Sequence, residues 1–162
     1  MNTSHAARLE WQDFKQLAPD ANAAVLKLSG LAEAHGLNKA LLELVKLHAS
    51  QINGCAFCVA IHVAAAQRLG IPDDKLHLVV AWREAPQFDA RERAALAWTE
   101  ALTLVAQGVP DSTYSEARAA FSEQELAYLT AAVLAINAWN RLGVAYRFTP
   151  PPITAEAKAA AE

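Results

Sequence analysis

The segment Ser50–His62 reads SQINGCAFCVAIH, and it holds both cysteines of the chain, Cys55 and Cys58, in a C-x-x-C spacing. A histidine, His62, follows four residues after the second cysteine. Such a pair is found in structural disulfides, in metal sites and in redox pairs, and also as two thiols buried like small apolar side chains. The sequence around the segment bears on each of these alternatives.

The residues on either side of this segment predict two helices joined by a turn. Apolar side chains recur at helical spacing after Asn38, and Asn53-Gly54 is a turn signal. A helix is then expected from about Cys55 to Leu69, ending at Gly70. The inward-facing residues predicted for the first of these helices are Leu41, Leu42, Val45 and Ile52.

Further outward, the same signals predict more helices and no strand, because no segment alternates apolar and polar residues with β-branched enrichment. The predicted helices are Trp11–Leu17, one capped by Asp20 and ending at Ala34, Lys75–Arg83, one capped by Asp89 and stopping at Gly108, a short one capped by Asp111 or Ser112, and one opened by a Ser122 capping box and ending near Tyr146. We therefore expect an all-α single domain of six to eight helices.

This domain is expected to have three parts. Residues 1–36 form a helical extension, residues 37–148 form the core with the C-x-x-C helix, and residues 149–162 form a disordered tail rich in proline, small and charged residues.

Composition excludes several classes of partner. The 162 residues carry a net charge of -3 with a pI near 5.9, so the chain has no basic surplus for nucleic acid, and its Lys and Arg are too scattered for a membrane surface. The longest apolar run, Thr130–Trp139, is shorter than the roughly 20 residues that span a bilayer, and the N-terminus has no apolar signal region. We expect a cytoplasmic protein, where paired cysteines are more often catalytic or metal-binding than structural.

The C-x-x-C helix would place its reactive groups on one stripe. At about 100° per residue, Cys55, Cys58 and His62 fall within an arc of about 60°. The cysteines would lie in the first turn, where free N–H groups and the helix dipole favour a thiolate, and His62 could accept or return a proton. Two alternatives stay open: the stripe could be a buried core face, or the cysteines could bind zinc with His62 and either a carboxylate or His48.

Glu43 lies in the strongly apolar segment KALLELVKLHA, twelve residues before Cys55. Its carboxylate could simply reach solvent. If the Asn53-Gly54 turn folds the two helices together, Glu43 could instead orient or deprotonate His62 and complete a Glu–His–Cys relay. The composite E-x11-C-x2-C-x3-H is far more specific than any of its parts.

This composite resembles the AhpD-like alkylhydroperoxidases of the carboxymuconolactone decarboxylase superfamily. SQINGCAFCVAIH is similar to the signature of its peroxidase-related branch, and the similarity extends through FDARERAALAWTEALT and INAWNRLGV. It covers roughly residues 37–144. One position departs, because Phe57 stands between the cysteines where the best-known members carry a second histidine.

The resemblance implies an enzyme: a thiol peroxidase that reduces alkyl or hydrogen peroxide in antioxidant defence through a dithiol/disulfide cycle. Cys58 would be oxidised to a sulfenic acid, Cys55 would donate a proton and then resolve it, and Glu43 and His62 would relay protons. No cofactor or metal is implied. The reductant would be a lipoyl- or thioredoxin-like dithiol, and the chain would assemble as a homotrimer or homohexamer. The alternative is a dithiol protein that does not react with peroxide, such as a disulfide reductase or redox sensor.

Two further expectations concern contacts. An apolar pocket near Phe57, Trp82 or Trp98 would suit alkyl groups, unless these aromatics belong to the core. The last helix is apolar on more than one face and is expected at a subunit contact. Its polar side chains, Asn137, Asn140 and Arg141, would hydrogen-bond across that contact or cap nearby loops.

Overall fold

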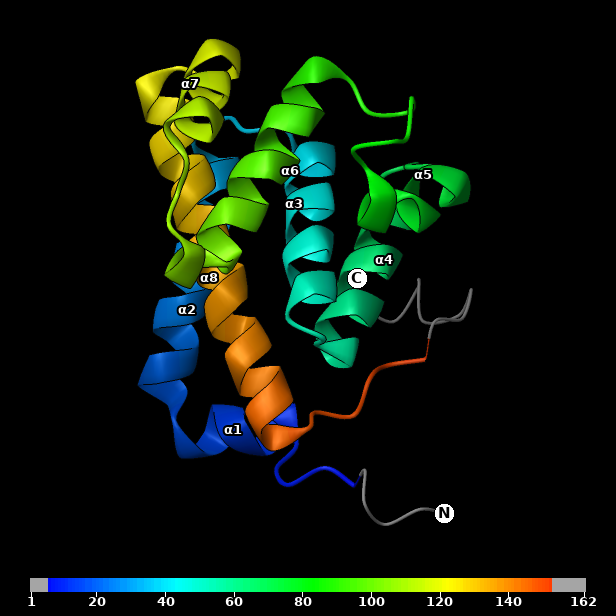
Figure 1. Cartoon of the computed structure of the whole chain (residues 1–162). Helices are drawn as coiled ribbons and strands as arrows, with labels where there is room; N and C mark the ends of the chain where they lie inside the picture. Colours follow the sequence, from blue (N-terminus) through cyan, green and yellow to red (C-terminus); the bar gives the residue numbers. More distant parts are fainter. Residues whose placement is uncertain (1–5, 153–162) are drawn as a thin grey trace.

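The computed structural model describes residues 6–152, and within these residues the chain is all helical, with no strand (Figure 1). The prediction of an all-α single domain of six to eight helices is confirmed. The elements are α1 (Trp11–Leu17), α2 (Pro19–Ala34), α3 (Lys39–Ile52), α4 (Ala56–Arg68), α5 (Asp73–His77), the 3-10 helix η2 (Val79–Ala81), α6 (Ala90–Thr103), the 3-10 helix η3 (Val105–Gln107), α7 (Asp111–Ala120) and α8 (Glu123–Tyr146).

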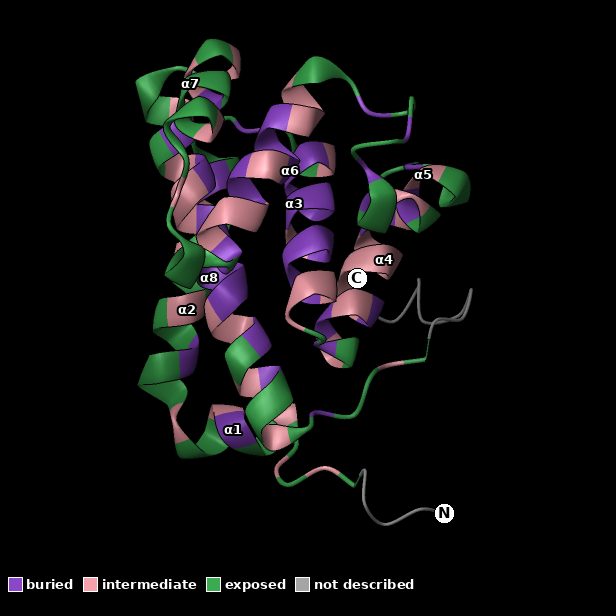
Figure 2. Cartoon of the chain, viewed as in Figure 1, coloured by how far each residue is buried: buried purple, intermediate pink, exposed green. Residues whose placement is uncertain are grey.

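Helix α3 is the centre of the fold. It begins after Asn38, as expected, and the side chain of Asn38 caps it by accepting a hydrogen bond from the N–H of Leu41. It packs against α4, α6 and α8, and Figure 2 shows it buried along most of its length. Its buried apolar side chains include Leu42, Val45 and Leu47. Any polar group on α3 that faces these neighbours therefore needs a partner inside the protein.

The turn after α3 folds α4 back onto it. Gly54 has a φ of 67°, in the left-handed region that glycine adopts most easily, and the N–H of Cys55 donates to the carbonyl of Ser50 at 3.0 Å. Cys55 then serves as the N-cap of α4, because its sulfur accepts a hydrogen bond from the N–H of Cys58 at 3.3 Å. The predicted break at Asn53-Gly54 is confirmed, and Cys58 lies in the first turn of α4.

Helix α8 begins at the predicted capping box. The N–H of Glu125 donates to Ser122 Oγ, and the N–H of Ser122 donates to Glu125 Oε2. The helix ends at Tyr146, as expected. It runs along α2 and packs against both α3 and α4 (Figure 1).

The predicted helix Lys75–Arg83 is wrong. The chain forms α5 and then η2. Leu76, Val79, Trp82 and Ala85 are all buried in one apolar cluster, and their spacing of three residues matches the 3.0 residues per turn of a 3-10 helix. Burial of this repeat against the core replaces the regular α-helix.

Three predicted helix ends are also wrong. The cap at Asp20 is absent, because α2 begins at Pro19, whose missing N–H needs no partner. Helix α6 ends at Thr103, and η3 fills the gap before Gly108. Helix α7 begins at Asp111 itself with Pro110 as N-cap, so neither Asp111 nor Ser112 caps it.

The segments that precede α1 and follow α8 lie together. The N–H of Arg8 donates to the carbonyl of Tyr146 at 2.8 Å, and Thr149 Oγ1 donates to Glu10 Oε1 at 2.6 Å. The division into residues 1–36, 37–148 and 149–162 stays a prediction, and residues 153–162 of the predicted tail lie outside the described residues. Within residues 6–152, none of the helices combines the length and the hydropathy that crossing a bilayer would require.

Candidate active site

Cys55 and Cys58 are joined by a disulfide at the start of α4. Both residues are almost fully buried, and they form an apolar cluster with Ala49 and Ile136, against which Phe57 and Trp139 also pack. The two cysteines are only three positions apart in sequence, so the bond closes a very short loop. A loop this short removes little chain entropy from the unfolded state, so structural stapling is a poor explanation of the pair.

Glu43 is buried, and it is bonded to the histidine of the motif. His62 Nδ1 lies 2.7 Å from Glu43 Oε2, and the two side chains are only 15% and 12% exposed. The contact exists because the turn at Gly54 brings α4 back along α3. Of the two alternatives for Glu43, the structure shows the one in which it contacts His62, and the solvent-reaching alternative is wrong.

The electrostatics of this pair determine which atom carries the proton. Burial alone would raise the pKa of the Glu43 carboxyl, but the hydrogen bond and charge of His62, together with Lys46, lower it to about 2. A carboxylate can only accept hydrogen bonds, so His62 Nδ1 is the donor. The other ring nitrogen, Nε2, is left to exchange a proton with a reacting group.

Lys46 is a member of the site that the sequence reasoning missed. Its Nζ donates to Glu43 Oε1 at 2.8 Å, so each carboxylate oxygen of Glu43 has one partner. The signal was available, because residues three apart face each other on a helix and Lys46 follows Glu43 at that spacing.

A cavity of about 270 Å³ lies beside the motif. Cys58, His62 and Lys46 contribute to its wall, and most of the remaining wall is apolar. The full lining comprises Trp11, Leu26, Ser29, Lys46, Phe57, Cys58, Ile61, His62, Ala132, Ala135, Ile136, Trp139 and Phe148. The second cysteine of the motif is thus placed next to a space that fits an apolar molecule.

The aromatics of this cavity differ from those expected. Phe57 lines it, but Trp82 and Trp98 are buried in the two larger core clusters, as the core alternative predicted. Trp11 and Trp139 take their place, and the rings of Trp11 and Phe57 have centroids 6.2 Å apart. Trp11 comes from α1, far from the motif in sequence, and no local pattern predicts that contact.

The zinc alternative has no support from His48. Its Nε2 lies 3.4 Å from Glu100 Oε2 and its ring packs edge-on against Trp82. Burial lowers the pKa of His48 below the ordinary value, although Glu100 opposes that shift. Among the described residues, no three His, Cys, Asp or Glu side chains come together in a group that could hold a metal ion.

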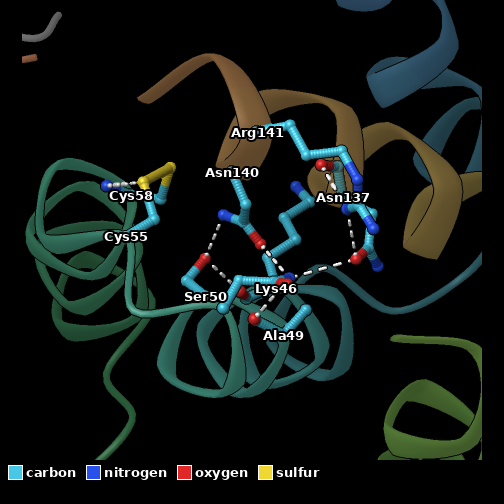
Figure 3. The surroundings of a disulfide bond; sticks show 9 residues. Lys46, Ala49, Ser50, Cys55, Cys58, Asn137, Asn140 and Arg141 are labelled. Atoms are coloured by element: carbon cyan, nitrogen blue, oxygen red, sulfur yellow. Dashed lines mark hydrogen bonds between the residues drawn. A yellow bond between two sulfur atoms is a disulfide. The ribbon is translucent and has the colours of Figure 1, made fainter. Parts of the chain in front are cut away.

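Polar side chains of α8 attach that helix to the turn before Cys55. Asn53 Nδ2 donates to Asn137 Oδ1 at 3.0 Å and lies 2.9 Å from Asn140 Oδ1. The Asn140 amide also lies 3.0 Å from Ser50 Oγ, and Arg141 donates to Asn137 (Figure 3). The loop-contact alternative is therefore confirmed for Asn137 and Asn140, whereas Arg141 bonds to Asn137 of its own helix.

Comparison with known proteins agrees with this architecture. Residues 19–101 match the carboxymuconolactone decarboxylase family. The uncharacterized protein YdfG of Bacillus subtilis is 30% identical over 133 residues, which cover 82% of this chain and 90% of that protein. A solved structure from Agrobacterium tumefaciens, of unknown function and proposed to be the antioxidant defence protein AhpD, is 38% identical, with a TM-score of 0.85 over 91% of this chain and 99% of that chain.

The same fold occurs in a debrominase. The debrominase Bmp8 matches with a TM-score of 0.72 over 100% of both chains at 18% identity, a level that shows the fold alone. The family match includes Glu43, both cysteines and His62, and the fold is that of the AhpD-like structures. On these grounds, the chain belongs to the carboxymuconolactone decarboxylase family and has an AhpD-like fold.

Proposed function

We propose that this protein is a thiol peroxidase that reduces alkyl or hydrogen peroxide through a Cys55–Cys58 dithiol/disulfide cycle. One observation carries the proposal: Cys58 and the Glu43-bonded His62 line the same apolar cavity. A redox-active sulfur, a proton carrier and a space for an apolar substrate therefore adjoin one another. The 38% identical structure proposed to be AhpD supports a role in antioxidant defence.

The first step oxidises Cys58. Its N–H lies in the first turn of α4, where the helix dipole stabilises a thiolate. The thiolate attacks the outer oxygen of ROOH, the O–O bond breaks, and Cys58 becomes a sulfenic acid. The departing RO⁻ takes one proton to leave as ROH, supplied by the Cys55 thiol or by His62, which Glu43 orients.

The second step forms the disulfide, and a third restores the dithiol. Cys55 sulfur displaces hydroxide from the Cys58 sulfenic acid, and the hydroxide leaves as water with the proton of the Cys55 thiol, or with one from His62 where Cys55 gave its proton in the first step. An external dithiol then reduces the disulfide by two electrons and becomes a disulfide itself. We propose a lipoyl- or thioredoxin-like protein as the source of that dithiol.

The cavity favours an organic hydroperoxide over hydrogen peroxide. Its walls are largely apolar, and Trp11, Phe57 and Trp139 offer ring surfaces to an alkyl or aryl group. Burying such a group stabilises its complex by about 25 cal/mol per Å² of apolar surface, a gain that hydrogen peroxide cannot make.

Phe57 contributes to the cavity instead of the relay. Its ring meets Phe148 with centroids 5.3 Å apart and also approaches Trp11. The position that holds a second histidine in the best-known relatives is therefore part of the cavity wall here, and His62 is the histidine that shares this wall with Cys58.

The test is consumption of cumene hydroperoxide with a dithiol reductant, comparing the wild type with Cys58→Ser. We expect turnover in the wild type and none above background in Cys58→Ser. A matched control is His35→Gln, an exposed histidine in the link between α2 and α3, which should leave turnover unchanged. Equal turnover in wild type and Cys58→Ser would reject the peroxidase. Rapid exchange of the wild-type dithiol with disulfides, without peroxide consumption, would instead support a disulfide reductase or sensor.

A further inference from the structure

Gly143 is a buried glycine near the end of α8, and it lies against the redox pair. A Cβ at this position would stand 2.7 Å from Cys55 Sγ and 3.5 Å from Cys58 Sγ, the first of which is closer than real Cβ atoms come to any neighbour. Gly143 does not have a positive φ, so its backbone does not require glycine. Glycine is also among the poorest helix formers. The contact with sulfur is the remaining reason for a glycine here.

The atoms on both sides of this contact are held in place. Cys55 is fixed by its N–H bond to Ser50 and by the bond from the Cys58 N–H to its sulfur. One turn before Gly143, Asn140 attaches α8 to Ser50 (Figure 3). Asn140 also contacts Asn53. After it, the N–H of Phe148 donates to the Gly143 carbonyl at 3.1 Å. An added methyl group could not be relieved by a small movement of either backbone.

We infer that Gly143 is a positioning residue of the redox pair: its missing side chain leaves the space in which Cys55 Sγ bonds to Cys58 Sγ. In the disulfide, Cys55 Sγ is tethered and cannot turn away from α8. In the dithiol, it can rotate about its own Cα–Cβ bond. A methyl group at position 143 would therefore disfavour the disulfide more than the dithiol. The inference rests on the dithiol cycle proposed above, but not on peroxide as the oxidant.

The experiment measures the equilibrium between dithiol and disulfide in glutathione buffers, read by alkylation and intact mass. For Gly143→Ala we expect the equilibrium constant for disulfide formation to fall at least tenfold, which corresponds to a reduction potential about 30 mV higher. The matched control is Gly30→Ala, because Gly30 also lies in a helix and has nothing within 4 Å of an added Cβ. The equilibrium constant for disulfide formation in Gly30→Ala should equal that of the wild type.

An unchanged constant in Gly143→Ala would overturn the inference. The measurement contains no peroxide, so a shifted constant in a protein without peroxidase activity would keep this inference and reject the proposed activity.

A second measurement covers the case in which Gly143→Ala does not fold. The same substitution is made in a Cys55→Ala background, where the sulfur that the new methyl group would meet is gone. In the oxidised wild-type background, we expect Gly143→Ala to lower the melting temperature. In the Cys55→Ala background, we expect Gly143→Ala to leave the melting temperature unchanged or to raise it. If Gly143→Ala lowers the melting temperature equally in the wild-type and Cys55→Ala proteins, the cause lies in helix packing and the inference is overturned. The same conclusion follows if the protein that carries both substitutions fails to fold.

Discussion

His62 Nδ1 donates a hydrogen bond to Glu43 Oε2 over 2.7 Å, and this contact joins α4 to α3 inside the protein. The two residues are 19 apart in sequence, and the reversal at Gly54 brings them together. Lys46 holds the other carboxylate oxygen. A buried negative charge with two positively polarised partners has consequences for both stability and reactivity.

The first prediction concerns stability against acid. The pKa of Glu43 falls from its ordinary 4.5 to about 2 on folding, so its contribution is fully present above about pH 4.5 and disappears as pH falls toward 2. At 1.36 kcal/mol per pKa unit, this contribution is on the order of 3 kcal/mol. Glu43→Gln should lower the free energy of unfolding at pH 7, and its deficit should shrink between pH 4.5 and 2.5 in urea titrations. Glu84→Gln, on the surface, should show no such deficit; a deficit independent of pH in Glu43→Gln would contradict the ionic explanation.

The second prediction concerns the reactive thiol. If Glu43 and His62 assist Cys58, the rate of its oxidation should rise with pH around a midpoint below about 8.5, the pKa of a free thiol. Removing the carboxylate in Glu43→Gln should move that midpoint upward and slow the reaction at pH 7. Stopped-flow measurement of cumene hydroperoxide against the reduced protein gives both profiles. Superimposable profiles would mean that the helix N-terminus alone tunes the thiol.

The third prediction separates the roles of the two cysteines. With Cys55→Ser, one equivalent of peroxide should leave a stable sulfenic acid on Cys58, because no neighbouring thiol can condense with it. Dimedone should then add to Cys58, as located by peptide mass spectrometry. The Cys58→Ser protein should take up no label at Cys55. Labelling of Cys55 with none at Cys58 would reverse the assignment.

The fourth prediction tests the cavity. Trp11→Ala removes a ring from its wall, so KM for cumene hydroperoxide should rise about tenfold while the reaction with hydrogen peroxide is unchanged. Leu17→Ala, in the same helix but on the surface and outside the cavity, controls for weakening of α1. If Trp11→Ala slowed the reactions with cumene hydroperoxide and hydrogen peroxide to the same extent, the thiol site would be damaged and the cavity would not be the cause.

The fifth prediction concerns assembly. Leu126, Leu129 and Val133 of α8 are buried within the chain, but Leu134 and Val144 are 56% and 48% exposed. We propose a homotrimer or homohexamer in which the exposed apolar side chains of α8, Leu134 and Val144, contact a neighbouring subunit. Light scattering at micromolar concentration should give a mass that is a multiple of the 17.4 kDa of one chain. Leu134→Glu should reduce the measured mass. A wild-type mass of one chain would contradict the proposal.

The sequence by itself determined most helices and the local chemistry of the motif. The caps at Asn38, Asp89 and Ser122 and the turn at Gly54 are interactions within a few residues, so their signals are complete in the local sequence. The position of Cys58 in the first turn of α4 follows from the same short-range rules.

The segment 75–83 shows where local signals fail. Its residues have helical composition, but burial of Leu76, Val79 and Trp82 against the core imposes a three-residue period. The energy of that burial comes from side chains distant in sequence, and it outweighs the weak local preference for a regular α-helix.

Only the tertiary structure decided what surrounds the cysteines. Sequence spacing could suggest that Glu43 meets His62, but Trp11 on the cavity wall and Gly143 against Cys55 Sγ come from α1 and α8, which are distant from the motif in sequence. Such contacts depend on the relative placement of helices, which is set by close packing over the whole core. No single segment of the chain contains a signal that predicts them.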